Sequence, residues 1–303
     1  MNIKRIIKSQ YVRHNILKLF SWLPDKFMLP MQYYIILHRR LNMKNPKRFT
    51  EKIQCYKAFY RNEEMLRCVD KYIVRDYVIE KLGTDKYLNK LYQVCDSAEK
   101  IDFDSLPNNF VIKTTDGGSG DNIYICKDKT SIDYQQVVSL VNSWRKKEYY
   151  RISREWAYLG AKKSQIIVEQ YLSQENDTEL LDYKLFCFNG VVKFMKIDFN
   201  RFSDHRANYY DLEMNLLPFG EAECPQCRSK IFEKPKNLQT MVNLAEKLSK
   251  NFPFVRVDFY NINGVIYFGE LTFYPSSGYT RFIPDDADFE LGKLFTYSFN
   301  QKS

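Results

Sequence analysis

The chain has 303 residues, of which 45% are hydrophobic and 16% aromatic, and its net charge is +9. A chain of this length and hydrophobic content can bury a core, which excludes a disordered protein and favours one enzyme-sized unit. Residues 1–45 carry nine Lys or Arg against the single acid Asp25, so the positive charge is concentrated there. This asymmetry predicts one basic docking surface, and it argues against a nucleic-acid partner bound along the whole fold.

Residues 2–23 have the periodicity of a basic helix that ends at Pro24. Its lysines either lie on the solvated face of a helix packed on the body, or rest on an anionic lipid or polysaccharide surface. A helical pattern then runs from Asn45 to the stop signal Gly83. We therefore expect a helical region over residues 1–83, basic over 1–45.

Beyond Gly83 the pattern changes to short β-rich runs separated by helical segments. The expected strands are Tyr87–Val94, Phe110–Lys113, Ile123–Cys126, Ile166–Tyr171, Tyr183–Phe188, Val191–Asp198, Phe254–Tyr260 and Val265–Phe273. The clearest late helix is Pro235–Asn251, with apolar residues on one face. Because no long Gly/Ser linker is present, we expect two packed α+β lobes, over residues 84–165 and 166–303.

A lysine stands at the end of an expected strand, and a glycine-rich loop follows it. The lysine is Lys113, and the loop contains Gly117, Gly118, Ser119 and Gly120. Glycine has no side chain, so the backbone N–H groups of such a loop approach phosphate oxygens closely. The segment matches neither Walker A nor the dinucleotide fingerprint. It is either a phosphate-binding loop or an ordinary hairpin.

Two later strands carry charges in apolar surroundings. Glu169 follows Val168 in an apolar strand. If its carboxylate is buried, an adenine amino group or a backbone amide would donate the hydrogen bonds that it needs. The alternative is an edge strand on which Glu169 faces water. Asp182 and Lys184 share one face of a strand in a hairpin with an Asn-Gly turn. These two residues form either a structural ion pair or a set of ligands for ribose and phosphate.

The hairpin Phe254–Phe273 carries the strongest chemical signal. Arg256 and Asp258 share one face of its first strand, and Glu270 and Thr272 share one face of its second strand. Two carboxylates brought together favour a cation between them, and Mg²⁺ prefers such oxygen ligands. A purely structural Arg–Asp ladder is the alternative.

The register of this hairpin decides whether its carboxylates meet. A two-residue turn at Asn263-Gly264 would set Asp258 opposite Gly269 and turn Glu270 away. A three-residue loop ending in Gly264 would bring the two acids together, and we adopt this register as a hypothesis.

Seven cysteines are scattered through the chain, and no apolar stretch approaches the ~20 residues needed to cross a bilayer. An odd number of thiols and no recognisable secretory leader predict a cytoplasmic protein with reduced cysteines. Cys224 and Cys227 form an isolated CxxC pair without a second ligand pair, so a zinc or redox role stays open. His205 lies in a polar loop and is either a base or a surface histidine.

In their order and spacing these segments resemble the ATP-grasp superfamily. Their amino-acid sequences are most similar to its TupA-like branch, which is named after a teichuronopeptide biosynthesis protein. The resemblance covers roughly residues 45–294. The similar stretches are Arg48–Ile53, Asp70-Lys71 with Arg75, Arg154–Tyr158, Asp182–Lys184, Arg256–Asp258 and Phe268–Thr272.

The resemblance implies two α+β lobes that clamp ATP together with Mg²⁺. Its site residues would be Lys113 on the α- and β-phosphates, Gly117–Gly120 over the terminal phosphates, Val168 and Glu169 at adenine, Asp182 at ribose and Lys184 at the phosphates. Asp258 and Glu270 would bind magnesium, and Arg256 would stabilise the transferred phosphoryl group. Thr272 stands where many members have asparagine, which leaves the number of magnesium ions open.

The implied activity is an ATP-dependent amide ligase that works through an acylphosphate and releases ADP and phosphate. The expected substrates are a carboxylated or lipid-linked glycan of a capsular or other surface polysaccharide, such as a uronic acid, and an amino acid or other amine. Arg201 and the polar loop to Arg206 are our hypothesis for the wall that binds the carboxylate. Residues 1–45 are expected to contact an anionic membrane peripherally, at its inner face. The alternatives are a nucleotide-sugar glycosyltransferase of the same pathway and a non-catalytic nucleotide-binding partner.

Overall fold

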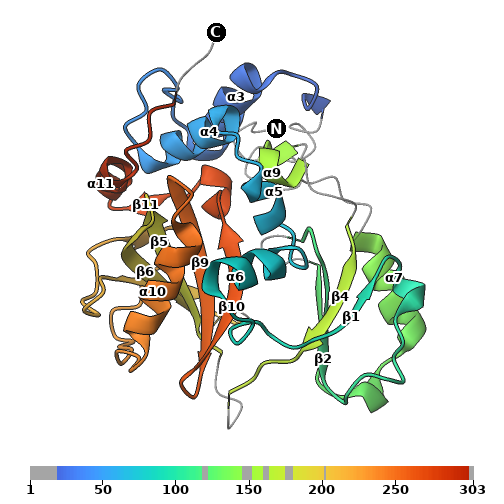
Figure 1. Cartoon of the computed structure of the whole chain (residues 1–303). Helices are drawn as coiled ribbons and strands as arrows, with labels where there is room; N and C mark the ends of the chain where they lie inside the picture. Colours follow the sequence, from blue (N-terminus) through green and yellow to red (C-terminus); the bar gives the residue numbers. More distant parts are fainter. Residues whose placement is uncertain are drawn as a thin grey trace.

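A computed structural model of the chain describes residues 19–117, 122–144, 152–159, 164–174, 180–200 and 203–299. In this part of the chain two lobes are each built on an antiparallel sheet, and amino-terminal helices lie at one end of the larger lobe (Figure 1). The α+β class expected from the sequence is confirmed. Outside the described residues lie most of the expected helix over 2–23, Gly118, Ser119, Gly120 and Arg201.

The amino-terminal region contributes four of the described helices, which are α3 (Asp25–Leu37), α4 (Phe49–Phe59), α5 (Glu64–Cys68) and α6 (Val74–Leu82). The helical pattern expected from Asn45 to Gly83 is therefore divided into three helices. The Asp70 carboxylate accepts the N–H groups of Tyr72 and Ile73 at 2.9 Å, which starts a new turn before α6. At the other end Gly83, with φ 71°, gives α6 a left-handed C-cap, as expected of a glycine stop signal.

The smaller sheet has the strand order β1-β4-β2-β3, and all its neighbours are antiparallel. Its strands are β1 (Leu91–Cys95), β2 (Phe110–Thr114), β3 (Ile123–Cys126) and β4 (Ile166–Gln170). Helix α7 (Tyr134–Trp144) covers one face, where its apolar side packs in a separate core (Figure 1). The strand expected from Tyr87 begins only at Leu91, because Asp85 and Leu88 close a turn with a 2.8 Å hydrogen bond.

The larger sheet has the strand order β10-β9-β5-β6-β7, again with antiparallel neighbours. Its strands are β5 (Asp182–Phe188), β6 (Val191–Phe199), β7 (Arg206–Tyr210), β9 (Phe254–Ile262) and β10 (Val265–Thr272). The expected Asn189-Gly190 turn joins β5 to β6, and both residues have the positive φ that a tight hairpin requires. Edge strand β7 was not predicted, because its segment continues a polar loop in the sequence.

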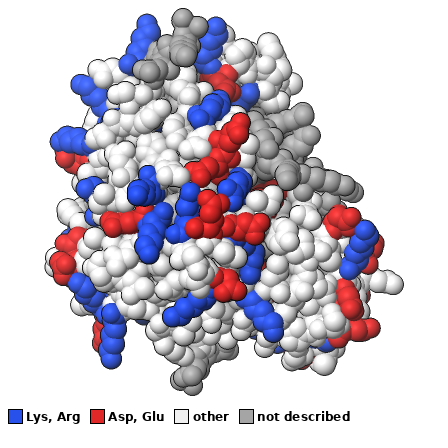
Figure 2. All heavy atoms as spheres, viewed as in Figure 1, with Lys and Arg blue, Asp and Glu red and all other residues white. Residues whose placement is uncertain are grey.

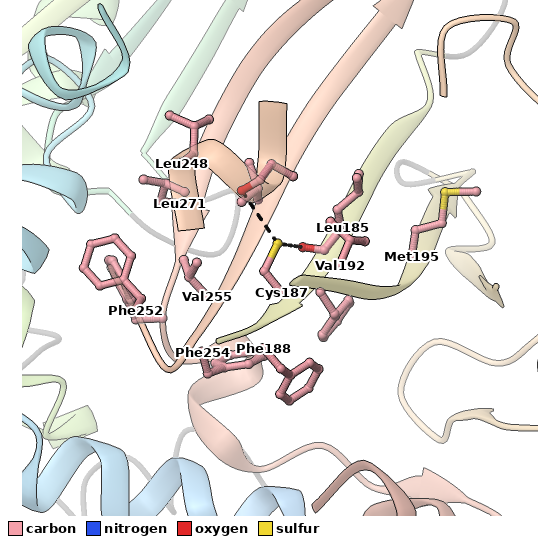
Figure 3. Close-up of a cluster of buried hydrophobic side chains, with 14 of the residues drawn as sticks. Leu185, Cys187, Phe188, Val192, Met195, Leu248, Phe252, Phe254, Val255 and Leu271 are labelled. Atoms are coloured by element: carbon pink, nitrogen blue, oxygen red, sulfur yellow. Dashed lines mark hydrogen bonds between the residues drawn. The ribbon is translucent and has the colours of Figure 1, made fainter. Parts of the chain in front are cut away.

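Helix α10 (Leu238–Ser249) lies within the expected helix Pro235–Asn251 and covers one face of the larger sheet (Figure 1). Its expected apolar face is buried. Figure 3 shows Cys187 of β5 in this core, with its Sγ 3.7 Å from the Leu185 carbonyl oxygen and 4.0 Å from that of Ala245. Because strand side chains alternate, the other face of the sheet receives Asp182 and Lys184.

Short elements complete the described fold. They are η1 (Ala98–Lys100), η2 (Lys129–Ser131), α9 (Trp156–Leu159), β8 (Gly220–Glu221), η4 (Pro275–Gly278), β11 (Phe282–Ile283) and α11 (Asp286–Leu294). Strand β8 pairs with β11, and α11 is joined to α4 through the Asp288 carboxylate, which accepts the Thr50 N–H at 2.9 Å. None of the described helices is long and apolar enough to cross a membrane.

The thiols differ in exposure, and this gives a first testable prediction. Six of the seven cysteines are buried, and burial raises the pKa of each of their thiols, to about 12 for Cys187 and Cys224. Cys227 is partly exposed, and hydrogen bonds from the Ser229 hydroxyl and the Lys230 amide lower its pKa. We expect a thiol reagent at pH 8 to modify one cysteine quickly in the native protein and the other six only after unfolding. A fast phase that persists in Cys227→Ser would contradict this assignment.

Candidate functional site

The hairpin of β9 and β10 brings the two expected metal ligands together, but not through the expected loop. Val265 pairs directly with Ile262, so the turn is the two-residue pair Asn263-Gly264, and the three-residue loop of our hypothesis is wrong. A β-bulge between Phe268 and Glu270 corrects the register. Gly269 is the extra residue, and as a result Glu270 faces Asp258 across the strands.

Arg256 connects the polar side chains of this hairpin. Its Nε and Nη2 donate to the two carboxylate oxygens of Asp258 at 2.7 and 2.5 Å. The same Nη2 lies 3.2 Å from Glu270 Oε1 and 3.0 Å from Thr272 Oγ1, and the Thr272 hydroxyl donates to Glu270 at 3.0 Å. Asp258 is buried, whereas 44% of the Glu270 side chain is exposed. One carboxylate is therefore fixed inside the sheet and the other is open to a ligand.

The two carboxylates have different electrostatic surroundings. Burial raises the pKa of Asp258, and the charges of Arg256 and Lys184 oppose it. Burial acts on Glu270 in the same direction, but there Arg256, Lys71 and Lys184 outweigh it and lower the pKa to about 2. Glu270 is therefore ionised at neutral pH, as a metal ligand must be.

A buried row of alternating charges extends from Asp258 across the sheet. Lys184 of β5 pairs with Asp182, and its Nζ lies 3.1 Å from Asp198 and 3.8 Å from Asp258. On β6, Lys196 lies 3.3 Å from Asp198 and 3.0 Å from Glu221. The expected pair of Asp182 and Lys184 is thus part of a larger network, which the strand register aligns on one face.

A second set of charges lies on the smaller sheet and at the start of α6. Lys113 Nζ lies 2.9 Å from Glu169, and Arg75 Nη1 lies 3.6 Å from the same carboxylate. Lys71 Nζ donates to the Gly117 carbonyl, and its backbone N–H donates to Thr115 at 2.9 Å. Val168 belongs to the core on the α7 face, so its side chain does not accompany that of Glu169.

The two sets of charges act on one another across the lobes. Burial lowers the pKa of Lys113, but Glu169, and more weakly Tyr260 and Glu270, outweigh it and raise the pKa. Burial lowers the pKa of Lys71, and the largest opposing charge is Glu270. We call this set the interlobe site, defined by Lys71, Lys113, Glu169, Asp258 and Glu270. Acidic and basic side chains mix across the middle of the face in Figure 2.

The donor atoms of the interlobe site fit magnesium and phosphate. Two carboxylates and the Thr272 hydroxyl on adjacent strands supply hard oxygen ligands, and exposed Glu270 leaves room for further ligands. Lysines on both sides supply positive charge for phosphate oxygens. Gly117 is the one glycine of the loop that the structure describes, and Lys71 binds its carbonyl.

A second group of possible metal donors is less suited to a cation. Atoms of Asp198, His205 and Cys224 lie within 4.8 Å of one another. Two lysines, Lys184 and Lys196, already neutralise the Asp198 carboxylate, so a cation there would meet two positive charges. Among the described residues Cys227 does not join this group, and the CxxC pair is not assigned as a metal site.

Several charged residues of the site were not singled out as ligands in the sequence. In the sequence Lys71 and Arg75 belong to stretches that carry the family resemblance, and Lys196, Asp198 and Glu221 are not among the predicted site residues. The alternation along Val191–Phe199 would have placed Lys196 and Asp198 on one face. No signal in the sequence connects Lys71 with Glu270, because they lie far apart in the chain, in the segment before α6 and on β10.

The bulge at Gly269 gives a second prediction. A Cβ there would lie 3.0 Å from the Asp258 carbonyl oxygen, so Gly269→Ala should displace the two carboxylates from each other. We expect Mg²⁺ to bind about tenfold more weakly, as for the loss of one ligand-orienting contact. Gly264→Ala is the control, because it strains the turn, with φ 83°, and meets no atom within 4 Å. Equal Mg²⁺ dependence in both variants would count against the role of the bulge.

The family model described as TupA-like ATPgrasp matches residues 51–296. A search of the curated proteins found no match. Similar solved structures include D-alanine–D-alanine ligase from Bacillus anthracis, with 18% identity, 75% of this chain and 65% of that chain covered, and a TM-score of 0.43.

Two further solved structures have the same level of similarity. Phosphoribosylamine–glycine ligase from Thermotoga maritima has 13% identity, covers 71% of this chain and 50% of that chain, and has a TM-score of 0.43. The ADP complex of N5-carboxyaminoimidazole synthetase from Staphylococcus aureus has 14% identity, coverage of 68% and 44%, and a TM-score of 0.42. The chain thus spans between two fifths and two thirds of the length of these three proteins.

Proposed function

We propose that this chain, which belongs to the TupA-like ATP-grasp family, is an ADP-forming carboxylate–amine ligase. The observation that carries the proposal is the pairing of Glu270 with Asp258 on the larger sheet, opposite Lys113 of the smaller lobe and Lys71 of the segment before α6. Carboxylates for a magnesium ion and lysines for phosphates on facing lobes are what ATP-dependent phosphoryl transfer requires.

We assign the nucleotide to residues of both lobes. Phosphate oxygens would be held by Lys113, Lys184 and the loop Gly117, Gly118, Ser119 and Gly120, adenine by Glu169 with the backbone at Val168, and ribose by Asp182. Mg²⁺ would be held by Asp258, Glu270 and Thr272. When bound, Mg²⁺ neutralises charge on the phosphate oxygens.

The protein groups stabilise the transfer of the γ-phosphoryl group to a substrate carboxylate. This transfer forms a carboxyl–phosphate bond and breaks the bond between the γ-phosphate and ADP. The carboxylate, a poor electrophile, thereby becomes an acylphosphate, which an amine attacks with release of phosphate. Arg256 is assigned to the charge on the transferred group, and Lys184 assists from the adjacent strand, 3.8 Å from Asp258. Closure of the two lobes would exclude water from the reactive acyl group.

The substrates are proposed from the family resemblance. They are a carboxylated glycan, free or lipid-linked, such as a uronic acid of a capsular or other surface polysaccharide, and an amino acid or other amine. We further propose that the enzyme acts in the cytoplasm at the inner membrane face, where residues 1–45 contact anionic lipid. Arg206 begins β7, and Asp204 neutralises it.

An assay of ADP formation tests the proposed ligase. Purified protein with ATP, Mg²⁺ and a panel of uronic acids and amino acids should release ADP and phosphate only when both substrates are present. Release of UDP from a nucleotide sugar without ADP would favour the glycosyltransferase. ATP binding without turnover on any pair would favour the non-catalytic nucleotide-binding partner.

The carboxylate-binding role of Arg201 gives a third prediction. Arg201→Ala should raise the KM of the carboxylate substrate about 10- to 100-fold, because a charge-assisted hydrogen bond is lost, and leave the KM of ATP unchanged. Steady-state kinetics with either substrate varied checks this. Unchanged affinity for the carboxylate would count against Arg201.

A further inference from the structure

Large hydrophobic side chains are exposed in a cluster at the start of the described chain. Of the fifteen exposed large hydrophobic residues among the described positions, five lie between residues 19 and 34. They are Leu19, Phe20, Trp22, Phe27 and Tyr34, which we call the aromatic face. Trp22 is 76% exposed, Phe27 56% and Tyr34 59%. The other ten are spread over the remaining described chain, where single exposed hydrophobic residues are ordinary.

Contacts with the rest of the protein fix the elements that carry the aromatic face. The opposite side of α3 is buried, and there the Tyr33 hydroxyl lies 2.7 Å from Thr50 Oγ1 of α4. Arg154 fixes the segment before the helix, since it donates to the Leu23 carbonyl at 2.8 Å and lies 3.3 Å from the Asp25 carboxylate. Phe27 and Tyr34 are seven residues apart, two turns of the helix, so they lie on one side. The exposed rings therefore belong to an ordered, outward surface.

The same segment of the chain carries exposed basic residues. Lys26 is exposed beside Phe27, with its Nζ 5.3 Å from the ring centroid, and Arg40 and Lys44 are exposed after the helix. Asp25, the one acid among residues 1–45, is neutralised by Arg154. Aromatic rings with lysine and arginine around them are what an interfacial surface on an anionic bilayer needs. No described helix can span a membrane, so such a contact would be peripheral.

We propose that the aromatic face, formed by α3 and the segment before it, inserts into the headgroup region of an anionic lipid bilayer and holds the enzyme on its surface. The rings would bury apolar area at the acyl boundary, and the basic side chains would bind lipid phosphates. A bilayer fits better than a protein partner, because residues 19–45 combine exposed rings with exposed basic side chains and a single acid, which Arg154 neutralises.

The same contact orients the interlobe site, and this part of the inference rests on the proposed ligase function. Gln32, on the buried side of α3, accepts a 2.6 Å hydrogen bond from the Tyr279 hydroxyl. Tyr279 follows η4, and η4 begins three residues after Thr272. Thr272 is the last residue of β10, the strand that carries Glu270. Lys57 of α4 fixes η4 by donating to the Ser277 carbonyl at 2.6 Å. Only α3, about 10 Å across, would therefore separate the bilayer from η4, the turn after β10. This short separation suits a lipid-linked acceptor.

Vesicle flotation of the full chain tests the surface without ATP or substrates. We expect binding to vesicles of equal phosphatidylglycerol and phosphatidylcholine, about tenfold weaker binding to pure phosphatidylcholine, and weaker binding at high salt. The triple variant Trp22→Ser, Phe27→Ser, Tyr34→Ser should bind at least about tenfold less than the wild type. The control variant Ile125→Ser, Val191→Ser, Ile231→Ser removes exposed hydrophobic residues elsewhere and should bind as the wild type does.

Tryptophan fluorescence gives an independent readout. Of the other two tryptophans Trp144 is buried and Trp156 is partly buried against the larger core, so lipids brominated near the headgroup should quench Trp22, and Trp22→Phe should lose most of the quenching. The inference is overturned if the triple variant binds vesicles like the control, or if Trp22 is not quenched. It is also overturned if the wild type dimerises in ultracentrifugation and the triple variant does not, because the face would then bind a second copy.

Two further measurements separate this inference from the proposed function. The melting temperature of the triple variant shows whether it folds, and the control triple variant reports the cost of three surface substitutions. ADP formation with soluble substrates should be the same in the wild type and the triple variant. Vesicle binding without any ADP formation would reject the ligase and leave the membrane surface supported.

Discussion

Replacing Glu270 with glutamine should lower ADP formation by about 10²- to 10³-fold, as expected when a charged group of a metal and phosphoryl-transfer site is lost. The substitution removes the partly exposed, ionised carboxylate that we assign to Mg²⁺, whose pKa the charges of Arg256, Lys71 and Lys184 lower to about 2 against the effect of its partial burial. A glutamine oxygen can still accept the hydrogen bond of Arg256, so the hairpin should keep its structure.

The measurement is ADP release at saturating ATP over a range of Mg²⁺ concentrations, with the melting temperature of each protein. Glu290→Gln is the matched control, because it makes the same chemical change on an exposed residue of α11. We expect the control to keep wild-type activity. Wild-type turnover in Glu270→Gln would remove Glu270 from the metal site and, with it, the observation on which the proposed function depends.

Gly292→Ala should destabilise the protein by about 3 kcal/mol, although alanine is the better helix former. Gly292 lies inside α11, where helix propensity alone predicts that alanine stabilises by about 1 kcal/mol. A Cβ at this position would overlap the carbonyl oxygen of Lys47 and lie 2.9 Å from the backbone nitrogen of Phe49. Because these are backbone atoms at the start of α4, the two helices would have to move apart.

Urea unfolding of the wild type, Gly292→Ala and Glu290→Ala measures this effect. Glu290 is on the exposed side of the same helix, so its replacement should change the free energy of unfolding by less than about 0.5 kcal/mol. Stabilisation by Gly292→Ala would mean that α11 does not pack on α4 as described. Moving α11 away from α4 would also lengthen the 2.8 Å hydrogen bond that Lys52 Nζ donates to the Gly292 carbonyl oxygen.

Local patterns in the sequence predicted most of the regular elements of the larger lobe. Alternation and the Asn-Gly signals located β5, β6, β9 and β10 to within about two residues, and the apolar stripe located α10. These signals succeed because each one reports a local preference of the backbone or a single buried face. The sequence pattern does not predict edge strand β7, because a strand that begins in a polar loop has no alternation of polar and apolar residues at its start.

The charged residues show the limit of such patterns. Lys57 lies among apolar helix positions in the sequence, and nothing there distinguishes it from a surface lysine. In the structure it is fully buried, where its Nζ donates to the Ser153 carbonyl at 3.0 Å and to Ser277. Burial lowers its pKa to about 8, against the opposing charge of Glu155. Its partners lie 96 and 220 positions away, so only the folded chain identifies its role.

By itself, the sequence determined the fold class, the family resemblance and the set of polar residues on each strand, because alternation and motif order are local properties. The tertiary structure decided which of these residues meet. The bulge at Gly269 set Glu270 opposite Asp258 despite the two-residue turn. The packing of the lobes brought Lys113 toward Glu270, and the packing of the segment before α6 brought Lys71 there. Register and lobe packing depend on contacts between distant segments, and no local pattern contains them.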